Sequence, residues 1–336
     1  MSAAHGGASG GAAEVRHLGC FGKLPSRGDF VKCGDNPGLL KVLDEWLSGA
    51  MDLMSVDPRW KITYDALAPL HFAFIGPRQK CAIAGHIAAS TDLSKRRFPF
   101  MMMSTMELLD PPGFVGSSPL ALARLWNRLE TMAAHLLAAG DATDALHALP
   151  ASSVPLELGP SAYGAAFADF LELQTVGALE VMLVQAGFGA TLRQLLLALC
   201  MLLQPVMRSG SSRLDKSLVL PLPHDRLYAN LVGAFWMHLI APFVMRADFE
   251  LALFVTRIAQ RPVLVLGFCG AAPATLLAIM DRRAGQEHHI GFDELSWVEA
   301  QLDGNPALRK VSSYLAQPGL SLKSARDSLR AAFIGD

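Results

Sequence analysis

Charged residues are scarce in this chain of 336 residues. Asp, Glu, Lys and Arg make up 18% of it, while hydrophobic residues make up 51%, and an average protein has about 25% charged residues. Few charges and many apolar residues favour collapse, so the composition excludes disorder for most of the chain. The 29 basic and 30 acidic residues leave a net charge of −1. Such a balance provides no overall field for attracting nucleic acid or an anionic membrane, and we expect no nucleic-acid partner.

Cysteine is also sparse, and no two cysteines form a CxxC pair. The five positions are Cys20, Cys33, Cys81, Cys200 and Cys269. An odd number at wide spacing argues against a disulfide framework and against a structural zinc site. We therefore expect reduced, mostly buried thiols in a cytoplasmic protein, with no metal and no cofactor.

Apolar runs stay shorter than the roughly 18 residues that a membrane-spanning helix needs. The longest are residues 195–203, which end before Gln204-Pro205, and residues 231–245, which contain His238 and Pro242. Both are typical of buried core helices, so we expect no membrane insertion. Residues 1–16 lack the basic start and apolar core of a signal peptide, and we expect them to form a disordered tail.

Familiar catalytic signatures are missing as well. The chain has no GxxxxGK[ST] loop, no GxSxG elbow and no HExxH motif. Gly187-Phe-Gly189 lacks the third glycine of a dinucleotide fingerprint, and the adjacent His288 and His289 cannot face the same way on a helix or strand. These motifs therefore identify no enzyme class.

Hydrophobic periodicity predicts strands and helices in both halves of the chain. In the first half we predict strands at 17–22, 70–75, 81–89 and 98–105, and helices that begin at Asn36-Pro37 and at Ser118-Pro119. In the second half we predict strands at 218–222, 249–255 and 263–268, and helices at 225–245, 273–281, 293–302, 306–316 and 321–333. The fold class is α/β (α+β), with two sheet-and-helix units whose mixed or antiparallel sheets are flanked by helices, and with a helix-rich middle and C-terminus.

Residues 141–160 mix small residues with three prolines and form the best candidate for a domain boundary. The predicted parts are the tail 1–16, an N-terminal α/β domain at 17–148, and a C-terminal domain at 149–336 that holds apolar helices at 161–207 and a second α/β unit at 216–336. Both halves run strand, proline-containing loop, tryptophan-bearing helix, strands and helix. We interpret them as two related units, with chance convergence as the alternative.

The charge deficit is concentrated in residues 151–207, which hold five charged side chains. A solvated helical segment of this length normally carries several more. We therefore expect at least two of its helices to be largely buried, either between the two α/β units or at an interface with a partner.

Two clusters combine charged residues with apolar anchors, at residues 23–30 and 90–100. Burial of Leu24 and Phe30 would pin the first cluster and leave its charges free to pair or to meet a partner. In the second, a basic triplet follows Asp92 and precedes an aromatic strand. The candidate partner-binding or loop-fixing residues are Lys23, Pro25, Arg27, Gly28, Asp29 and Phe30 in the first cluster, and Ser90, Asp92, Arg96 and Arg97 in the second.

Three interpretations of these clusters stay open. In the first, ion pairs such as Asp92 with Arg27, or Asp29 with Arg97, fix the loops internally. In the second, the clusters form a protein-docking surface, to which the arginine fork is suited because it binds carboxylates bidentately. In the third, Asp29 and Asp92 act with a histidine such as His86 in a hydrolase or phosphatase-like site.

The same clusters carry a resemblance to a known family. Gly19-Cys-Phe-Gly-Lys-Leu-Pro-Ser-Arg-Gly-Asp-Phe30 resembles the G-x-[FY]-G-K-L-P-x-R-G-D-F opening of the type VI secretion-associated TagF family, also called ImpM. Asp44-Glu-Trp46 looks like that family's D-x-W. Ser90-x-Asp92 followed by Arg97-Phe-Pro-Phe100 looks like its S-x-D…R-x-F-P-L, with Phe in place of the final Leu.

That resemblance covers about residues 17–140. The second half resembles the longer ImpM-type members in four segments, which are Leu220-Pro-Leu-Pro223, Phe235-Trp236, Ala247-Asp-Phe-Glu-Leu251 and Lys310-Val-Ser-Ser-Tyr-Leu-Ala-Gln-Pro318.

The resemblance implies a cytoplasmic accessory protein of the bacterial type VI secretion system. TagF-like proteins act as post-translational repressors of secretion. They are associated with the system's forkhead-associated scaffold protein, and they oppose activation by threonine phosphorylation. The family brings no catalytic residues to this chain. We therefore expect a non-enzymatic regulator that binds a protein partner, with a homo-oligomer left open, and the alternatives are a structural assembly component or a cryptic hydrolase.

Overall fold

The computed structural model describes residues 14–159, 161–209 and 214–335. Most of the predicted tail lies outside these residues. Its last part is not a tail, because Glu14–His17 form strand β1, which pairs antiparallel with β7 (Ser153–Leu156) in a small two-stranded sheet. Backbone pairing with a segment some 140 positions away is not visible in a local sequence pattern.

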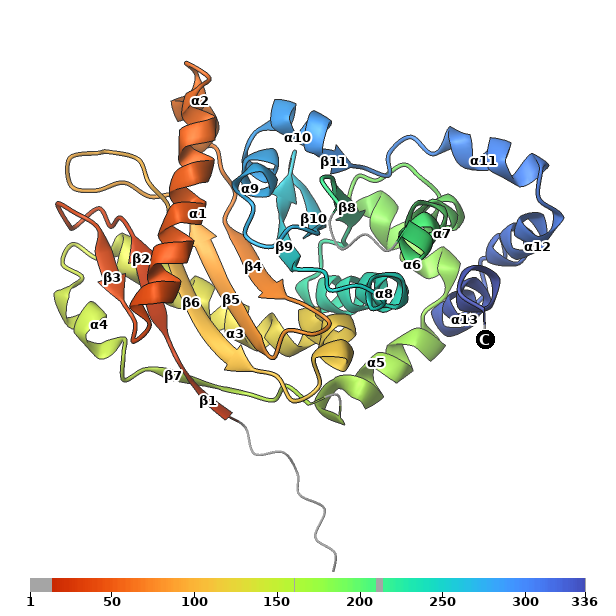
Figure 1. Cartoon of the computed structure of the whole chain (residues 1–336), viewed down its shortest axis with the longest axis horizontal. Coiled ribbons are helices and arrows are strands. Elements are labelled where there is room, and N and C mark those ends of the chain that lie inside the picture. Colours follow the sequence, from red (N-terminus) through yellow and green to blue (C-terminus); the bar gives the residue numbers. More distant parts are fainter. Residues whose placement is uncertain (1–13, 160, 210–213, 336) are drawn as a thin grey trace, which may run out of the picture.

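A nine-stranded sheet runs through the described part of the chain, in the order β11-β8-β10-β9-β4-β5-β6-β2-β3 (Figure 1). The first half supplies β2 (Gly19–Gly22), β3 (Val31–Cys33), β4 (Leu70–Ile75), β5 (Cys81–Ala88) and β6 (Phe100–Glu107). The second half supplies β8 (Ser217–Pro221), β9 (Leu251–Ile258), β10 (Arg261–Gly267) and β11 (His289–Ile290). Neighbouring strands pair antiparallel except β11, which is parallel to β8. The predicted α/β class, with a mixed sheet flanked by helices, is confirmed.

Strands from the two halves meet at β4 and β9. These strands pair antiparallel from His71 opposite Val255 to Ile75 opposite Leu251. Both carry buried apolar residues on their two faces, such as Phe72 and Ala73 on β4, which is unsuited to a solvent-exposed edge. The predicted units therefore share one continuous sheet.

Long helices cover both faces of this sheet. On one face, α1 (Pro37–Ser55) packs against α9 (Pro273–Met280), and Trp46 contacts the rings of Phe72 and Phe254 there. On the other face, α3 (Pro111–Ala138) packs along α8 (Arg226–Val244). Short helices α2 (Trp60–Asp65) and α10 (Arg282–His288) follow α1 and α9.

These faces correct the interpretation of the halves as two related units. A two-fold rotation that places β9 on β4 and β10 on β5 leaves each helix on its own side of the sheet. The tryptophan-bearing helix of the second half, α8, would then lie with α3 and not with its supposed equivalent α1. The two halves have a similar order of elements, but they are therefore not two copies of one structural unit.

Helix α3 begins eight residues earlier than predicted. The Asp110 side chain caps it by accepting a hydrogen bond from the Gly113 backbone N–H at 3.1 Å, and a proline follows at the first helical position. Pro119, the predicted start, lies inside the helix. It cannot donate to the Val115 carbonyl, and the Ser118 hydroxyl donates to that carbonyl instead, at 3.0 Å.

A helical layer adjoins α8 and fills the rest of the chain. Its members are α5 (Ser161–Leu173), α6 (Val176–Gln185), α7 (Leu192–Ser209), α11 (Ser296–Asp303), α12 (Pro306–Leu315) and α13 (Leu322–Phe333). Helix α4 (Thr143–Ala148) lies apart from this layer, at the end of the molecule that holds β3 (Figure 1). Residues 195–200 of α7 are fully buried. By contrast, α5 is exposed at most positions, so the expectation of at least two largely buried helices is met only by α7. The other two helices of this segment, α5 and α6, expose Ala and Gly, which cost little to expose, and also the large apolar side chains of Leu173, Val181 and Val184.

One helix in the described part of the chain, α8, is long and apolar enough to cross a membrane by length and composition. In this fold 61% of its apolar window is buried. Its buried residues include Trp236, whose indole N–H donates to the Pro221 carbonyl at 2.8 Å. These contacts are those of a core helix.

Candidate functional site: two paired loops

Two loops meet at the end of the sheet where β2 leaves and β6 enters. Residues 23–30 connect β2 to β3, and residues 89–99 connect β5 to β6. Backbone hydrogen bonds join them, from Leu93 N to the Arg27 carbonyl at 2.8 Å and from Lys23 N to the Pro99 carbonyl at 3.4 Å. The Ser90 hydroxyl adds a bond to the Lys23 carbonyl at 2.6 Å. The two predicted clusters therefore form one site, which we name the paired loops.

Asp92 lies at the centre of the paired loops and is fully buried. The Lys23 ammonium lies 3.0 Å from one carboxylate oxygen, and the Arg96 Nε donates to the same oxygen at 2.6 Å. The other oxygen accepts the Arg96 backbone N–H at 2.9 Å. The Arg96 guanidinium also donates to the Gly28 carbonyl at 2.9 Å, so a single carboxylate ties both loops together.

Two opposing influences set the pKa of Asp92. Burial raises the pKa, but the hydrogen bonds from the Arg96 backbone N–H, the Lys23 ammonium and the Arg96 side chain outweigh it and lower the pKa to about 2. The carboxylate is therefore ionised at neutral pH and fully engaged by cations. A carboxylate in that state is a poor proton acceptor and a good structural tie.

The particular ion pairs that we predicted are wrong, although internal pairing itself is present. Arg97 binds Asp65 of α2 with two hydrogen bonds of 2.7 and 2.6 Å. Arg27 reaches away from Asp92, to the Thr143 hydroxyl at 2.5 Å and to Asp141 at 3.6 Å. Neighbouring side chains on an extended segment point to opposite sides, so Arg96 and Arg97 cannot serve the same carboxylate.

Asp29, the other carboxylate of the first loop, turns back on its own backbone. Its Oδ1 accepts the Phe30 backbone N–H at 2.8 Å, and the residue is exposed. This turn brings the Phe30 ring over the sheet's end. Pro25 and Gly28 lie in the same stretch, half-buried and exposed respectively.

Tyr64 supports the paired loops and was not predicted. Its hydroxyl donates to the Ser90 carbonyl and accepts the Ser90 backbone N–H, each at 2.9 Å. Burial raises the pKa of this phenol above its ordinary range. Helix α2, which places it, was also missed, and the spacing of Trp60 and Tyr64 by four positions is the sequence signal that indicates it.

Aromatic rings form the apolar part of the site. Phe30 stacks on Phe21 with centroids 5.6 Å apart and meets the edge of Phe98 at 4.9 Å, and the Lys23 ammonium lies 5.1 Å from the Phe30 centroid. Leu24 is buried as expected, but Phe30 keeps 40% of its surface exposed. Leu93 in the facing loop is 65% exposed.

The outer surface of the paired loops is therefore apolar and cationic. Lys95 and Arg96 are exposed beside Leu93, and Arg27 is partly exposed across from them. Lys95 adopts a φ of 62°, the left-handed conformation that ends the turn and directs it outward.

The proposed hydrolase residues are not brought together. His86 lies on the sheet face covered by α3, where its Nδ1 is 3.1 Å from the Nδ1 of His71. Burial lowers the pKa of His86 to about 4 and that of His71 to about 3. The polar contacts of Asp92 are with Lys23 and Arg96. Within the described residues, no group of three or more His, Cys, Asp or Glu is arranged to hold a metal ion.

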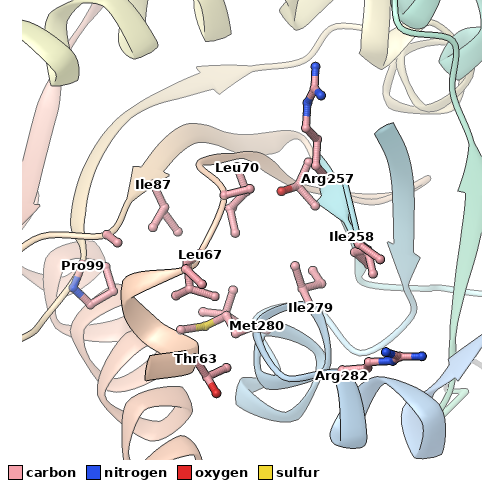
Figure 2. A pocket seen from close by; sticks show the side chains of 16 residues that line it. Thr63, Leu67, Leu70, Ile87, Pro99, Arg257, Ile258, Ile279, Met280 and Arg282 are labelled. Atoms are coloured by element: carbon pink, nitrogen blue, oxygen red, sulfur yellow. The ribbon is translucent and has the colours of Figure 1, made fainter. Parts of the chain in front are cut away.

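A cavity of about 220 Å³ opens beside the paired loops (Figure 2). Its labelled lining is largely apolar and comes from Thr63, Leu67, Leu70, Ile87, Pro99, Ile258, Ile279 and Met280, with Arg257 and Arg282 at its margin. The two guanidinium groups reach away from the apolar side chains in this view. A cavity of about 150 Å³ holds one benzene, and drug-sized ligands need about 300 Å³ or more. This space fits one large apolar side chain.

Comparison with known proteins identifies the class to which the paired loops belong. Residues 19–151 match the model of the TagF N-terminal domain, described as type VI secretion system-associated. That stretch contains both loops, α1, α2 and α3. The predicted resemblance to the TagF family is therefore confirmed over residues 19–151, which are less than half of the chain.

Among solved structures, the crystal structure of PA0076 from Pseudomonas aeruginosa PAO1 is similar to part of this chain. Its sequence is 26% identical, and the match covers 41% of this chain and 64% of that chain, with a TM-score of 0.31. The match thus spans less than two thirds of PA0076. Comparison with the curated proteins gives no match. The resemblance of the second half to ImpM-type members stays a prediction.

Proposed function

We propose that this protein is a cytoplasmic, post-translational repressor of type VI secretion that acts by binding a protein partner through the paired loops. The proposed partner is a forkhead-associated scaffold protein of the secretion system, and the proposed activity is non-enzymatic, with no role for nucleic acid, a cofactor or membrane insertion. The supporting observation is an exposed surface of cationic and apolar side chains on loops that are held in place by the buried Asp92.

Internal contacts hold the paired loops in one conformation. Asp92 binds Lys23 and Arg96, Tyr64 binds both backbone groups of Ser90, and Phe30 stacks on Phe21. A loop that is already held in one conformation loses little conformational entropy when it binds. The exposed side chains outside this network, and the exposed parts of Phe30 and Arg96 within it, are available to a partner.

The exposed side chains of the paired loops are of two kinds, apolar and cationic. Leu93 and the exposed part of Phe30 supply apolar anchors, and Lys95, Arg96 and Arg27 surround them with positive charge. Such a surface complements an acidic patch with an apolar centre, in which anchors give affinity and charges give orientation. The neighbouring cavity has room for one apolar side chain of the same partner.

A pull-down from native cells tests the proposed surface. Leu93→Asp and Lys95→Glu change exposed side chains outside the Asp92 network, and we expect each to weaken capture of the partner about tenfold, equal to about 1.4 kcal/mol. Leu227→Asp and Lys80→Glu are matched controls at exposed positions, on α8 and at the opposite end of β5.

Equal capture by loop variants and controls would remove the paired loops as the binding surface. All four variants should keep the wild-type Tm, because surface changes of this kind alter stability by less than about 0.5 kcal/mol. A structural assembly component remains the second candidate, and the two roles predict opposite effects of deletion on secretion.

A further inference from the structure

Two cysteines that are separated in the sequence, Cys20 and Cys33, are neighbours in the fold. Cys20 on β2 lies directly opposite Cys33 on β3, in an antiparallel pair that continues through Phe21 opposite Lys32. Residues opposite one another in such a pair have Cα atoms about 4.5–5.5 Å apart. Disulfide-bonded cysteines have Cα atoms about 4.4–6.8 Å apart, so the backbone already meets the requirement.

Both thiols point to the same face of the sheet. Cys20 belongs to the buried core on the α3 side, and Cys33 packs against that core. The thiols interact directly. A hydrogen bond from Cys20 lowers the pKa of Cys33 to about 7 and, together with burial, that bond raises the pKa of Cys20. Cys33 is therefore the thiol that ionises first.

The thiol that ionises first, Cys33, is also the more accessible to solvent. Cys33 is half-buried on β3, the last strand of the sheet, whereas Cys20 is fully buried. A small oxidant can reach the edge thiol and not the inner one. The attacking thiolate and the resolving thiol are thereby distinguished by position.

We propose that Cys20 and Cys33 form a reversible cross-strand disulfide, with a small-molecule disulfide such as glutathione disulfide as oxidant. The Cys33 thiolate attacks one sulfur of the oxidant, and the S–S bond breaks to release one glutathione thiolate. Cys20 then loses its proton and attacks the Cys33 sulfur, which expels the second glutathione thiolate. Two protein thiols are oxidised, and one oxidant molecule is reduced to two thiols.

The disulfide would close a ring around the first of the paired loops. The segment between the two cysteines contains Lys23 and the whole turn to Phe30. Closing a loop restricts the unfolded chain and stabilises the fold. It would also hold β3 against β2 at the base of the binding surface. An effect on partner binding rests on the proposed function, whereas disulfide formation itself does not.

Peptide mapping of the full chain in buffers of graded glutathione redox state tests the proposal. We expect a linked peptide pair that contains Cys20 and Cys33, an intact mass lower by two hydrogen atoms, a higher Tm, and full reversal by dithiothreitol. Cys33→Ser should abolish the linkage. Cys269→Ser is the matched control and should preserve it, because the Cys269 thiol lies elsewhere and donates to the Leu214 carbonyl at 3.1 Å.

Folded wild-type protein that keeps both thiols free, or that stops at Cys33 joined to glutathione, would overturn the proposal. This result is measured on the wild-type protein, so it does not depend on whether the variants fold. Partner capture is measured separately in the oxidised and reduced forms. If the disulfide forms but partner capture is the same in both forms, the linkage is established and has no effect on the proposed function.

Discussion

Asp92 is the side chain on which the paired loops depend. It was predicted as a candidate residue, and the structure places it in a buried contact with Lys23 and Arg96. Its partners were not predictable, because the partner of a charged residue depends on which way each strand end turns its side chains. The family motifs indicate which segments matter, whereas the pairs within them are set by the three-dimensional structure.

Two histidines in contact, the buried His86 and the half-buried His71, make stability depend on pH. His71 and His86 contact each other, and Glu130 and Arg226 are the charged groups that face them. Burial lowers both pKa values, to about 3 and about 4, from about 6.5 in the unfolded chain. The unfolded chain thus binds protons that the folded chain rejects, so stability decreases as pH falls from about 6.5 toward 4.

We expect this loss to approach about 1.4 kcal/mol per pH unit for each histidine. Urea unfolding at pH 7, 6, 5 and 4.5 measures it. The double variant His71→Gln, His86→Gln should show a shallower decrease than the wild type, and His147→Gln, at an exposed position on α4, should match the wild type. Equal slopes in all three proteins would contradict the assignment.

At the scale of elements, most strands and helices were predicted, and several end where predicted, such as β4 at Leu70–Ile75, but some ends were misplaced. Helix α3 is the clearest case, since Pro119 looks like a helix start and lies inside the helix. A local pattern cannot reveal that the Ser118 hydroxyl replaces the hydrogen bond that the proline removes. Helix α5 is the opposite case, since its apolar composition suggested burial and its small residues are exposed.

Ser118→Ala tests the role of that hydroxyl. The substitution leaves the buried Val115 carbonyl without its partner, and such a loss costs about 1–3 kcal/mol. Ser117→Ala removes a hydroxyl from the same helix at an exposed bond to Gly113 and should cost less than about 0.5 kcal/mol. Urea midpoints at unchanged m-value give both numbers. Equal costs would show that the proline needs no such compensation.

At the scale of the whole molecule, the matched region ends near residue 151, but the sheet does not. Strand β4 pairs with β9, and α3 packs along α8, so the family domain completes its core with elements from the second half. Local periodicity predicts two separate units here, because pairing between distant strands leaves no mark on the local pattern. The domain boundaries themselves stay a prediction.

This shared core gives the second half a purpose that needs no separate activity. It covers β4 and the apolar face of α3, which would otherwise be exposed. The paired loops lie at the end of the sheet that the second half does not cover, so they remain free to act as the proposed binding surface.

Secretion by a deletion strain measures the central claim most directly. If the protein is a repressor that acts through the paired loops, deletion raises type VI secretion. Wild-type protein and the Lys80→Glu control then lower it again, and Leu93→Asp and Lys95→Glu fail to do so at equal protein levels. Secretion that disappears on deletion would instead indicate a structural component, and full repression by both loop variants would contradict the assignment of the surface.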